Sequence, residues 1–261
     1  MSSDGPSPIL IVNDVSKSFG GLQAVNRATL DVAGGSITGL IGPNGAGKTT
    51  LFNLISGFLR PDSGEIYFQG ERIDHLPAHL VFRRGLVRTF QIPRELAGMT
   101  VIENLMLVPL DQAGERLWNT WFLPWRVAAQ ENVNFDKAED VLKFLNLHHL
   151  RDEYAANLSG GQKKLLELGR TLMCAPKMIL LDEPAAGVNR VLMRTIVDDI
   201  KRLRDELGIT FFVIEHDMDV IAWLCDELIV MSEGTKLAEG PPDEVRADAR
   251  VLEAYLGGRG A

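Results

Sequence analysis

Short apolar runs alternate with longer amphipathic segments along most of the chain. Four runs rich in β-branched and aromatic residues, each bounded by Gly, Asp or Asn, predict strands at 9–15, 28–32, 36–42 and 64–70. A helix is predicted to begin within GKTT, at residues 47–50, and to run to about Phe58. Its apolar positions recur at helical spacing, which indicates one buried face.

The same alternation returns in the last part of the chain. Buried strands are predicted at 178–184 and 210–216, helices at 162–173 and 191–207, a hairpin over 228–240 that turns at 232–235, and a short helix near 251–256. Continuous apolar strands that alternate with helices are typical of a parallel sheet covered on both faces. The pattern therefore predicts an α/β fold.

Residues 75–157 differ, because helices and loops replace the strands. We interpret 1–261 as a single domain that contains a helical subdomain at approximately 92–157. An aromatic stripe in this region, Trp118, Trp121, Phe122 and Trp125, has helical spacing, although Pro124 interrupts or starts a helix there. One interpretation is that the stripe packs on the chain's own helical lobe. The other is that it contacts a membrane subunit or the surface of the inner leaflet.

Composition narrows the classes of partner. Hydrophobic residues make up 46% of the 261 and charged residues 24%, as in ordinary globular proteins. The net charge of −8 argues against a broad basic surface for nucleic acid, so none is expected as a partner. A local basic patch at Arg83, Arg84 and Arg88 stays open.

Cysteine usage and the apolar runs bear on location. Two cysteines are too few for a disulfide framework or a zinc cage and fit a reducing cytosol. The start, MSSDGPSP, lacks the pattern of a secretory signal, and no apolar run is long enough for a spanning helix. Work at a membrane would therefore require a partner.

A phosphate-binding motif occupies residues 42–49, GPNGAGKT, between an apolar strand and an apolar helix. Glycines at 42, 45 and 47 allow backbone N–H groups to surround phosphate oxygens. Lys48 would contact the β- and γ-phosphates, and the Thr49 hydroxyl would bind Mg²⁺. The alternative is a glycine loop that merely caps a helix.

Two further strands end in groups suited to phosphate chemistry. Asp182 and Glu183 follow one buried strand, and His216 follows another. Ligands of open parallel sheets bind beyond the carboxyl ends of strands. Asp182 is suited to hold Mg²⁺ through water, Glu183 to deprotonate an attacking water, and His216 to contact the γ-phosphate. The alternatives are two surface acids and a structural histidine.

A second glycine-rich helix start lies at residues 158–162, LSGGQ. Ser159 suits an N-cap, and its hydroxyl could instead reach an incoming phosphate. The alternative is a flexible hinge followed by a helix cap.

Together these motifs, in this order and along nearly the whole chain, resemble the nucleotide-binding subunits of ABC transporters. The resemblance implies a P-loop NTPase (RecA-like) core with an antiparallel β flank and an inserted helical subdomain. It also implies an ATPase that uses Mg²⁺ and works as a homodimer or a paired heterodimer. In that family, LSGGQ of one subunit closes over the ATP held by the P-loop of the other.

The resemblance also assigns roles to individual residues. Phe19 takes the place of an adenine-stacking aromatic, and Gln91 that of a glutamine that contacts Mg²⁺ and senses the transmembrane partner. Asn189 stands where many members have an acid. The implied ATP-binding residues are Phe19, Val25, Asn44, Gly45, Ala46, Gly47, Lys48, Thr49, Thr50, Gln91, Ser159, Gly160, Gly161 and Gln162. The implied metal ligands are Thr49, Gln91 and Asp182, and the implied catalytic residues are Glu183 and His216.

Several local sequences resemble one subgroup, the ATPases of branched-chain amino-acid importers. They are PAAGVN, IEHDMDVI, RTFQ with MTVIENLML, the closing VLEAYLG, and the long insert before LSGGQ. This implies permease subunits as partners, a solute-binding protein as an indirect one, and a peripheral place on the cytoplasmic face of the inner membrane. Alternatives are urea or short-chain amide uptake, lipopolysaccharide export, or a non-transport ABC ATPase of metal-cluster assembly or translation.

Overall fold

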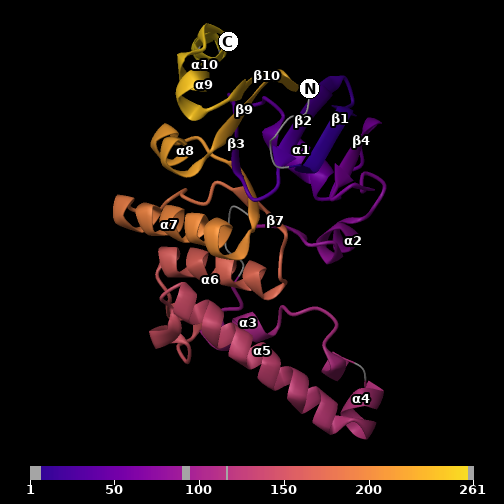
Figure 1. Ribbon diagram of the computed structural model, residues 1–261, viewed down its shortest axis with the longest axis vertical. Coiled ribbons are helices and arrows are strands. Elements are labelled where there is room, and N and C mark those ends of the chain that lie inside the picture. The colour runs from indigo at the N-terminus through magenta and orange to yellow at the C-terminus, as the bar shows by residue number, and fades with distance from the viewer. Residues whose placement is uncertain (1–6, 90–94, 116, 258–261) are drawn as a thin grey trace. The chain divides into compact units, whose positions relative to one another are not determined.

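The computed structural model describes residues 7–89, 95–115 and 117–257. The chain forms two compact units. One combines Met1–Arg88 with Lys177–Ala261, and the other is Thr89–Pro176 (Figure 1). Each unit is described by itself.

A six-stranded sheet forms the centre of the first unit, in the order β10-β9-β3-β8-β7-β6. Its strands are β3 (Ile37–Ile41), β6 (Leu86–Arg88), β7 (Met178–Asp182), β8 (Thr210–Ile214), β9 (Glu227–Ser232) and β10 (Thr235–Gly240). Only β10 pairs antiparallel, and every residue of β3, β7 and β8 is buried. The predicted α/β class with a covered parallel sheet is confirmed.

A second, antiparallel sheet has the order β2-β1-β4-β5. Its strands are β1 (Pro8–Phe19), β2 (Leu22–Ala33), β4 (Ser63–Phe68) and β5 (Glu71–Arg72). β1 and β2 are much longer than predicted, because their pairing continues through bulges and polar positions as far as the pair Phe19–Leu22. The apolar runs marked only the buried half of each strand.

The helices of the first unit are α1 (Lys48–Ile55), α2 (Ala78–Arg83), α7 (Arg190–Leu207), α8 (Met218–Leu224), α9 (Pro242–Ala247) and α10 (Ala249–Gly257). The predicted extension of α1 to Phe58 is wrong. Gly57 turns the chain with φ of +74°, and a Cβ there would lie 2.8 Å from the Leu76 carbonyl oxygen. The predicted short helix near 251–256 is confirmed as α10. Helix α9 before it was not predicted, and the extended Asp248 separates the two.

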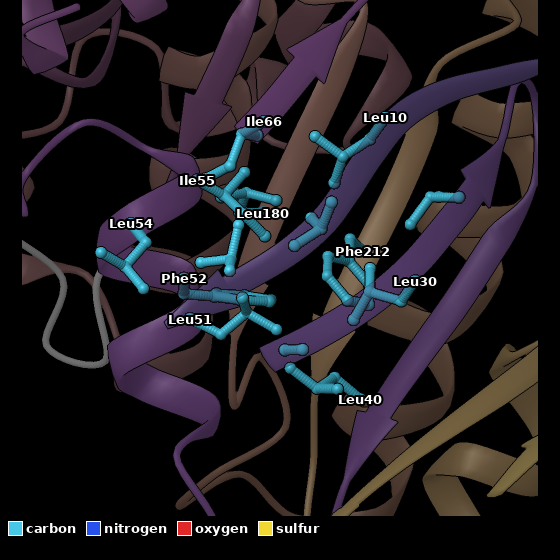
Figure 2. Packing of buried hydrophobic residues seen from close by; sticks show 14 of the residues in the cluster. Leu10, Leu30, Leu40, Leu51, Phe52, Leu54, Ile55, Ile66, Leu180 and Phe212 are labelled. Atoms are coloured by element: carbon cyan, nitrogen blue, oxygen red, sulfur yellow. The ribbon is translucent and has the colours of Figure 1, made fainter. Parts of the chain in front are cut away.

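Helix α1 packs between the two sheets. Phe52 of α1 and Phe212 of β8 have ring centroids 5.1 Å apart, and Leu180 of β7 belongs to the same buried cluster (Figure 2). Leu10 and Leu30 reach this cluster from the antiparallel sheet. Close packing on both sides therefore holds the start of α1, and the loop before it, in a defined position.

The second unit is helical, with α3 (Val101–Met106), α4 (Leu117–Phe122), α5 (Pro124–Phe144) and α6 (Gly160–Met173). At Gly169 of α6 an added Cβ would lie 3.1–3.3 Å from side chains of Leu145, Leu105 and Val141. Glycine thus permits close helix packing here. No described helix in either unit is long and apolar enough to cross a membrane.

The aromatic stripe does not pack on the helical lobe. Trp118, Trp121 and Phe122 of α4 and Trp125 of α5 are 76, 81, 62 and 67% exposed. The packing interpretation is therefore wrong. Pro124 starts α5, and the first buried residue of that helix is Asn134, so the stripe lies beyond the buried part of α5.

Candidate nucleotide-binding site

Three neighbouring strands of the parallel sheet end at the same edge. Leu40 of β3 is paired with Ile214 of β8, and Ile214 is paired with Asp182 of β7. The segments that follow these strands, each with a predicted phosphate motif, therefore emerge side by side. This is the edge at which open parallel sheets bind ligands.

Close backbone contacts explain two glycines of the loop between β3 and α1. Gly42 has φ of +149°, and a Cβ there would lie 2.1 Å from the carbonyl oxygen of Met231. Gly47 has φ of +95°, and its Cβ would lie 2.3 Å from the carbonyl oxygen of Ala24. No other residue fits either position without moving backbone.

Lys48 is the first residue of α1, directly after this loop, and is only 6% exposed. Its Nζ donates hydrogen bonds to the carbonyl oxygens of Gly42 at 2.7 Å and of Pro43 at 3.0 Å. Burial lowers the pKa of Lys48, while the carboxylates of Glu183 and Asp182 act in the opposite direction. The cation is thus placed among anionic groups at the mouth of the loop.

A cavity of about 620 Å³ opens over the loop. It is lined by Phe19, Leu22, Gln23, Ala24, Asn44, Gly45, Ala46, Gly47, Lys48, Thr49, Thr50, Glu183, Ile214, His216 and Glu233. Sequence reasoning gave no site role to five of these residues, because nothing in their local pattern distinguishes them: Leu22, Gln23, Ala24, Ile214 and Glu233. Val25 is fully buried in the core. Phe19 is 47% exposed, so its ring is accessible for stacking.

Glu183 and His216 both line the cavity and contact each other. Oε1 of Glu183 lies 3.0 Å from Nε2 of His216. Glu183 has φ of +51°, and its N–H donates to the carbonyl oxygen of Ile214 at 2.9 Å. A left-handed conformation is uncommon for a residue with a Cβ, and such strain clusters at functional sites.

Arg88 forms a buried ion pair with Asp182 that sequence reasoning missed. Its Nη2 lies 3.0 Å from Oδ2 of Asp182, and both side chains are 8% exposed. Its Nη1 also donates to Oδ1 of Asn53 at 2.6 Å. Arg84 is instead paired with Glu71 at the surface. Arg88 therefore belongs to no basic surface patch.

Glu215, to which sequence reasoning gave no role, connects the segment that follows Glu183 with the segment that contains His216. Its carboxylate accepts hydrogen bonds from the N–H of Ala185 at 2.9 Å and of His216 at 3.1 Å. Burial raises its pKa, and these hydrogen bonds oppose the rise. Glu215 thus fixes the loop after β7 to the loop after β8.

The glycine-rich start of α6 belongs to the second unit. Ser159 accepts a hydrogen bond from the Gln162 N–H at 3.4 Å, and the Gln162 side chain accepts one from the Ser159 N–H at 2.8 Å. This reciprocal capping box fixes the helix start, of which Ser159 and Gly160 are exposed and Gly161 is buried. Gln91 lies outside the described residues.

Thr49 and Asp182 offer a hydroxyl and a carboxylate oxygen, the hard donors that Mg²⁺ prefers, so the residues present fit this ion. Among the described residues no three His, Cys, Asp or Glu side chains form a metal cage. Mg²⁺ commonly takes one or two protein ligands and completes its shell with phosphate and water.

Comparison with known families supports this geometry. Residues 25–186 match the family described as ABC transporter, and residues 235–261 match the one described as branched-chain amino acid ATP-binding cassette transporter. The chain is 44% identical to the probable branched-chain amino acid transport ATP-binding protein LivG of Archaeoglobus fulgidus, over 95% of each chain. It is 37% identical to the high-affinity LivG protein of Escherichia coli K12, over 96% of this chain and 98% of that one.

Solved structures agree. A crystal structure of an ATP-binding cassette of an ABC transporter in its ADP conformation has a TM-score of 0.81 and 38% identity, and covers 96% of this chain and 99% of that one. A nucleotide-free ATP-binding cassette has a TM-score of 0.82 and 40% identity, over 95% and 98% of the two chains. The chain belongs to the ABC transporter family, as an ATP-hydrolysing subunit.

Proposed function

We propose that this chain powers the uptake of branched-chain amino acids through separate membrane subunits. The observation that carries the proposal is the similarity over 95–96% of the chain to transport ATP-binding proteins named for these solutes. The match of residues 235–261 to the corresponding family supports it independently, because that segment lies outside the general ABC transporter match.

ATP would occupy the cavity over the P-loop, with adenine against Phe19 and the phosphates against the loop of residues 44–50. Lys48 now donates two of its three N–H groups to loop carbonyls. Phosphate oxygens offer stronger, charge-assisted hydrogen bonds, so binding would draw Lys48 toward the β- and γ-phosphates.

Glu183 would act as the general base. Its carboxylate accepts a proton from water as the water oxygen bonds to the γ-phosphorus, and the bond from phosphorus to the β–γ bridging oxygen breaks. ADP leaves with the bonding electrons, and phosphate is the second product. His216 would orient Glu183 and contact the γ-phosphate, consistent with their 3.0 Å separation. Mg²⁺ held by Thr49, Gln91 and Asp182 would neutralise charge on the phosphates.

Two subunits would share each ATP. Ser159, Gly160, Gly161 and Gln162 of one copy would close over the nucleotide held by the other. The capping box supports this because it presents the exposed Ser159 and Gly160 at a helix N-terminus, where backbone N–H groups and the dipole favour an anion. Closure and opening would move permease subunits on the cytoplasmic face of the inner membrane, near Gln91.

Uptake in the native organism tests the proposal. Chromosomal Glu183→Gln should abolish high-affinity uptake of radiolabelled leucine, isoleucine and valine, while urea uptake in the same cells stays unchanged. Proteins that co-purify with the chain from detergent-solubilised membranes should include permease subunits. Unchanged leucine uptake, or loss of urea uptake alone, would refute the choice of solute.

A further inference from the structure

The exposed aromatic residues of the second unit form a surface that the nucleotide chemistry does not use. We define the aromatic tip as Trp118, Trp121 and Phe122 of α4 with Trp125 and Arg126 of α5. On α4 the three aromatic residues have i, i+3, i+4 spacing and share a face. The rings of Trp118 and Phe122 stack with centroids 5.8 Å apart, yet all four aromatic side chains are 62–81% exposed.

The tip lies beyond the buried core of its own unit. Residues 124–133 of α5 are exposed or half-buried, and burial begins at Asn134. Ten helical residues span about 15 Å. Figure 1 shows α4 at the end of α5 that lies farthest from α6. The short segment 111–114 meets this stretch, with the Ala113 N–H donating to the Gln130 side chain at 2.6 Å, but it leaves all four aromatic residues more than 60% exposed.

We infer that the aromatic tip inserts into the headgroup region of an anionic phospholipid surface. Tryptophan is enriched at membrane–water interfaces, where its ring is apolar and its N–H is hydrated. Peripheral segments bind such surfaces through aromatic residues combined with basic ones. The aromatic content and the charge of the tip both favour binding to a lipid surface.

The charge of the tip complements anionic headgroups. No Asp or Glu occurs between Glu115 and Glu131, although the whole chain has a net charge of −8. Arg126 is exposed and forms no ion pair with any residue in the described ranges.

The area of the tip argues against a protein partner. An aromatic side chain presents about 150–250 Å², so four that are 62–81% exposed offer roughly 500–600 Å². Stable protein interfaces bury about 800 Å² on each side. Shallow insertion into a lipid interface needs no complementary surface of that size.

Tryptophan fluorescence reports on the tip directly, because three of the four tryptophans belong to it and Trp223 is the other. The purified full chain, without nucleotide, is mixed with vesicles of phosphatidylcholine alone or with a quarter phosphatidylglycerol. We expect a blue shift of emission and co-sedimentation with the anionic vesicles. Absence of both overturns the inference.

Variants separate tip insertion from adsorption elsewhere. Trp121→Ser with Trp125→Ser should weaken binding at least about tenfold, because buried aromatic area is lost. Leu207→Ser, which removes an exposed apolar residue on α7, should leave binding unchanged. Arg126→Gln should weaken binding to anionic vesicles about fivefold and leave binding to neutral ones unaltered.

The double variant should retain the ATPase activity of the unaltered chain, since the tip is not part of the cavity. Equal sedimentation of the double variant and the unaltered chain would overturn the inference. A second outcome would also overturn it: the unaltered chain does not bind vesicles, and the double variant no longer co-purifies with permease subunits. The tip would then bind a protein. Neither result bears on ATP hydrolysis or on the transported solute.

Discussion

The buried pair between Arg88 and Asp182 predicts a large loss of stability from one substitution. Arg88→Met keeps most of the side-chain length but removes the cation 3.0 Å from Asp182, together with the hydrogen bond to Asn53. Both charged side chains are 8% exposed, so solvent cannot replace the lost partner. Breaking such a pair costs about 3–5 kcal/mol, because it leaves a buried charge uncompensated.

Urea unfolding and thermal unfolding measure this cost. For a domain of this size, about 3–5 kcal/mol corresponds to a fall in Tm of roughly 6–20 °C. Arg84→Met is the matched control, because Arg84 pairs with Glu71 at the surface and should lose at most about 1 kcal/mol. Combining Arg88→Met with Asp182→Leu should recover most of the stability, since no buried charge remains. A loss below about 1 kcal/mol for Arg88→Met would refute the argument.

Three further predictions follow from contacts in the first unit. Gly47→Ala should lower the free energy of unfolding by about 3 kcal/mol or more, measured by thermal unfolding, because the added Cβ would clash with backbone. Gly45→Ala is the control: its Cβ would meet no atom within 4 Å, so the free energy of unfolding should fall by only about 1–2 kcal/mol. Burial raises the pKa of Asp199 from 3.8 to about 6, so its carboxylate destabilises the fold above pH 6 and the penalty disappears as the pH falls toward 3.8. Asp199→Asn should therefore add up to about 3 kcal/mol at pH 8 and almost nothing at pH 4, measured by urea unfolding, and a gain independent of pH would contradict this. Lys48→Ala should weaken binding of a fluorescent ATP analogue by about 10- to 100-fold in an equilibrium titration, the equivalent of one charge-assisted hydrogen bond or two.

Much of the fold could be predicted from apolar periodicity. The strands of the parallel sheet are fully buried, so their sequences are continuous apolar runs with distinct ends. The strands of the antiparallel sheet are half-exposed, and their polar positions concealed how far β1 and β2 extend. The limits of α1 depend on Gly57 meeting the carbonyl of Leu76, a contact between segments that no local pattern contains.

The candidate site shows the same division. Lys48, Glu183 and His216 follow strands at recognisable motifs, and they line one cavity. Arg88 and Glu215 act through partners distant in the sequence, the first through Asp182 and the second through Ala185. Their roles required the strand order, because only the sheet brings those segments together.

The exposed aromatic tip illustrates a different limit. Helical spacing of Trp118, Trp121 and Phe122 indicates a shared face, but it does not say whether that face meets the protein or solvent. The decisive fact is that burial on α5 begins only at Asn134. The start of burial on α5 depends on how far α3 and α6 extend along that helix, and the sequence of α4 does not contain this information.

Light scattering of Glu183→Gln at saturating MgATP tests two claims together: that Glu183 is the general base, and that two subunits complete each ATP site. If Glu183 removes the proton from water in a site completed by a second subunit, the variant binds ATP without turnover and its measured mass doubles and persists. The chain with Glu183 unaltered should return to the monomer mass as ATP is consumed. A variant that stays monomeric with ATP bound, or that hydrolyses ATP at the unaltered rate, would contradict this mechanism.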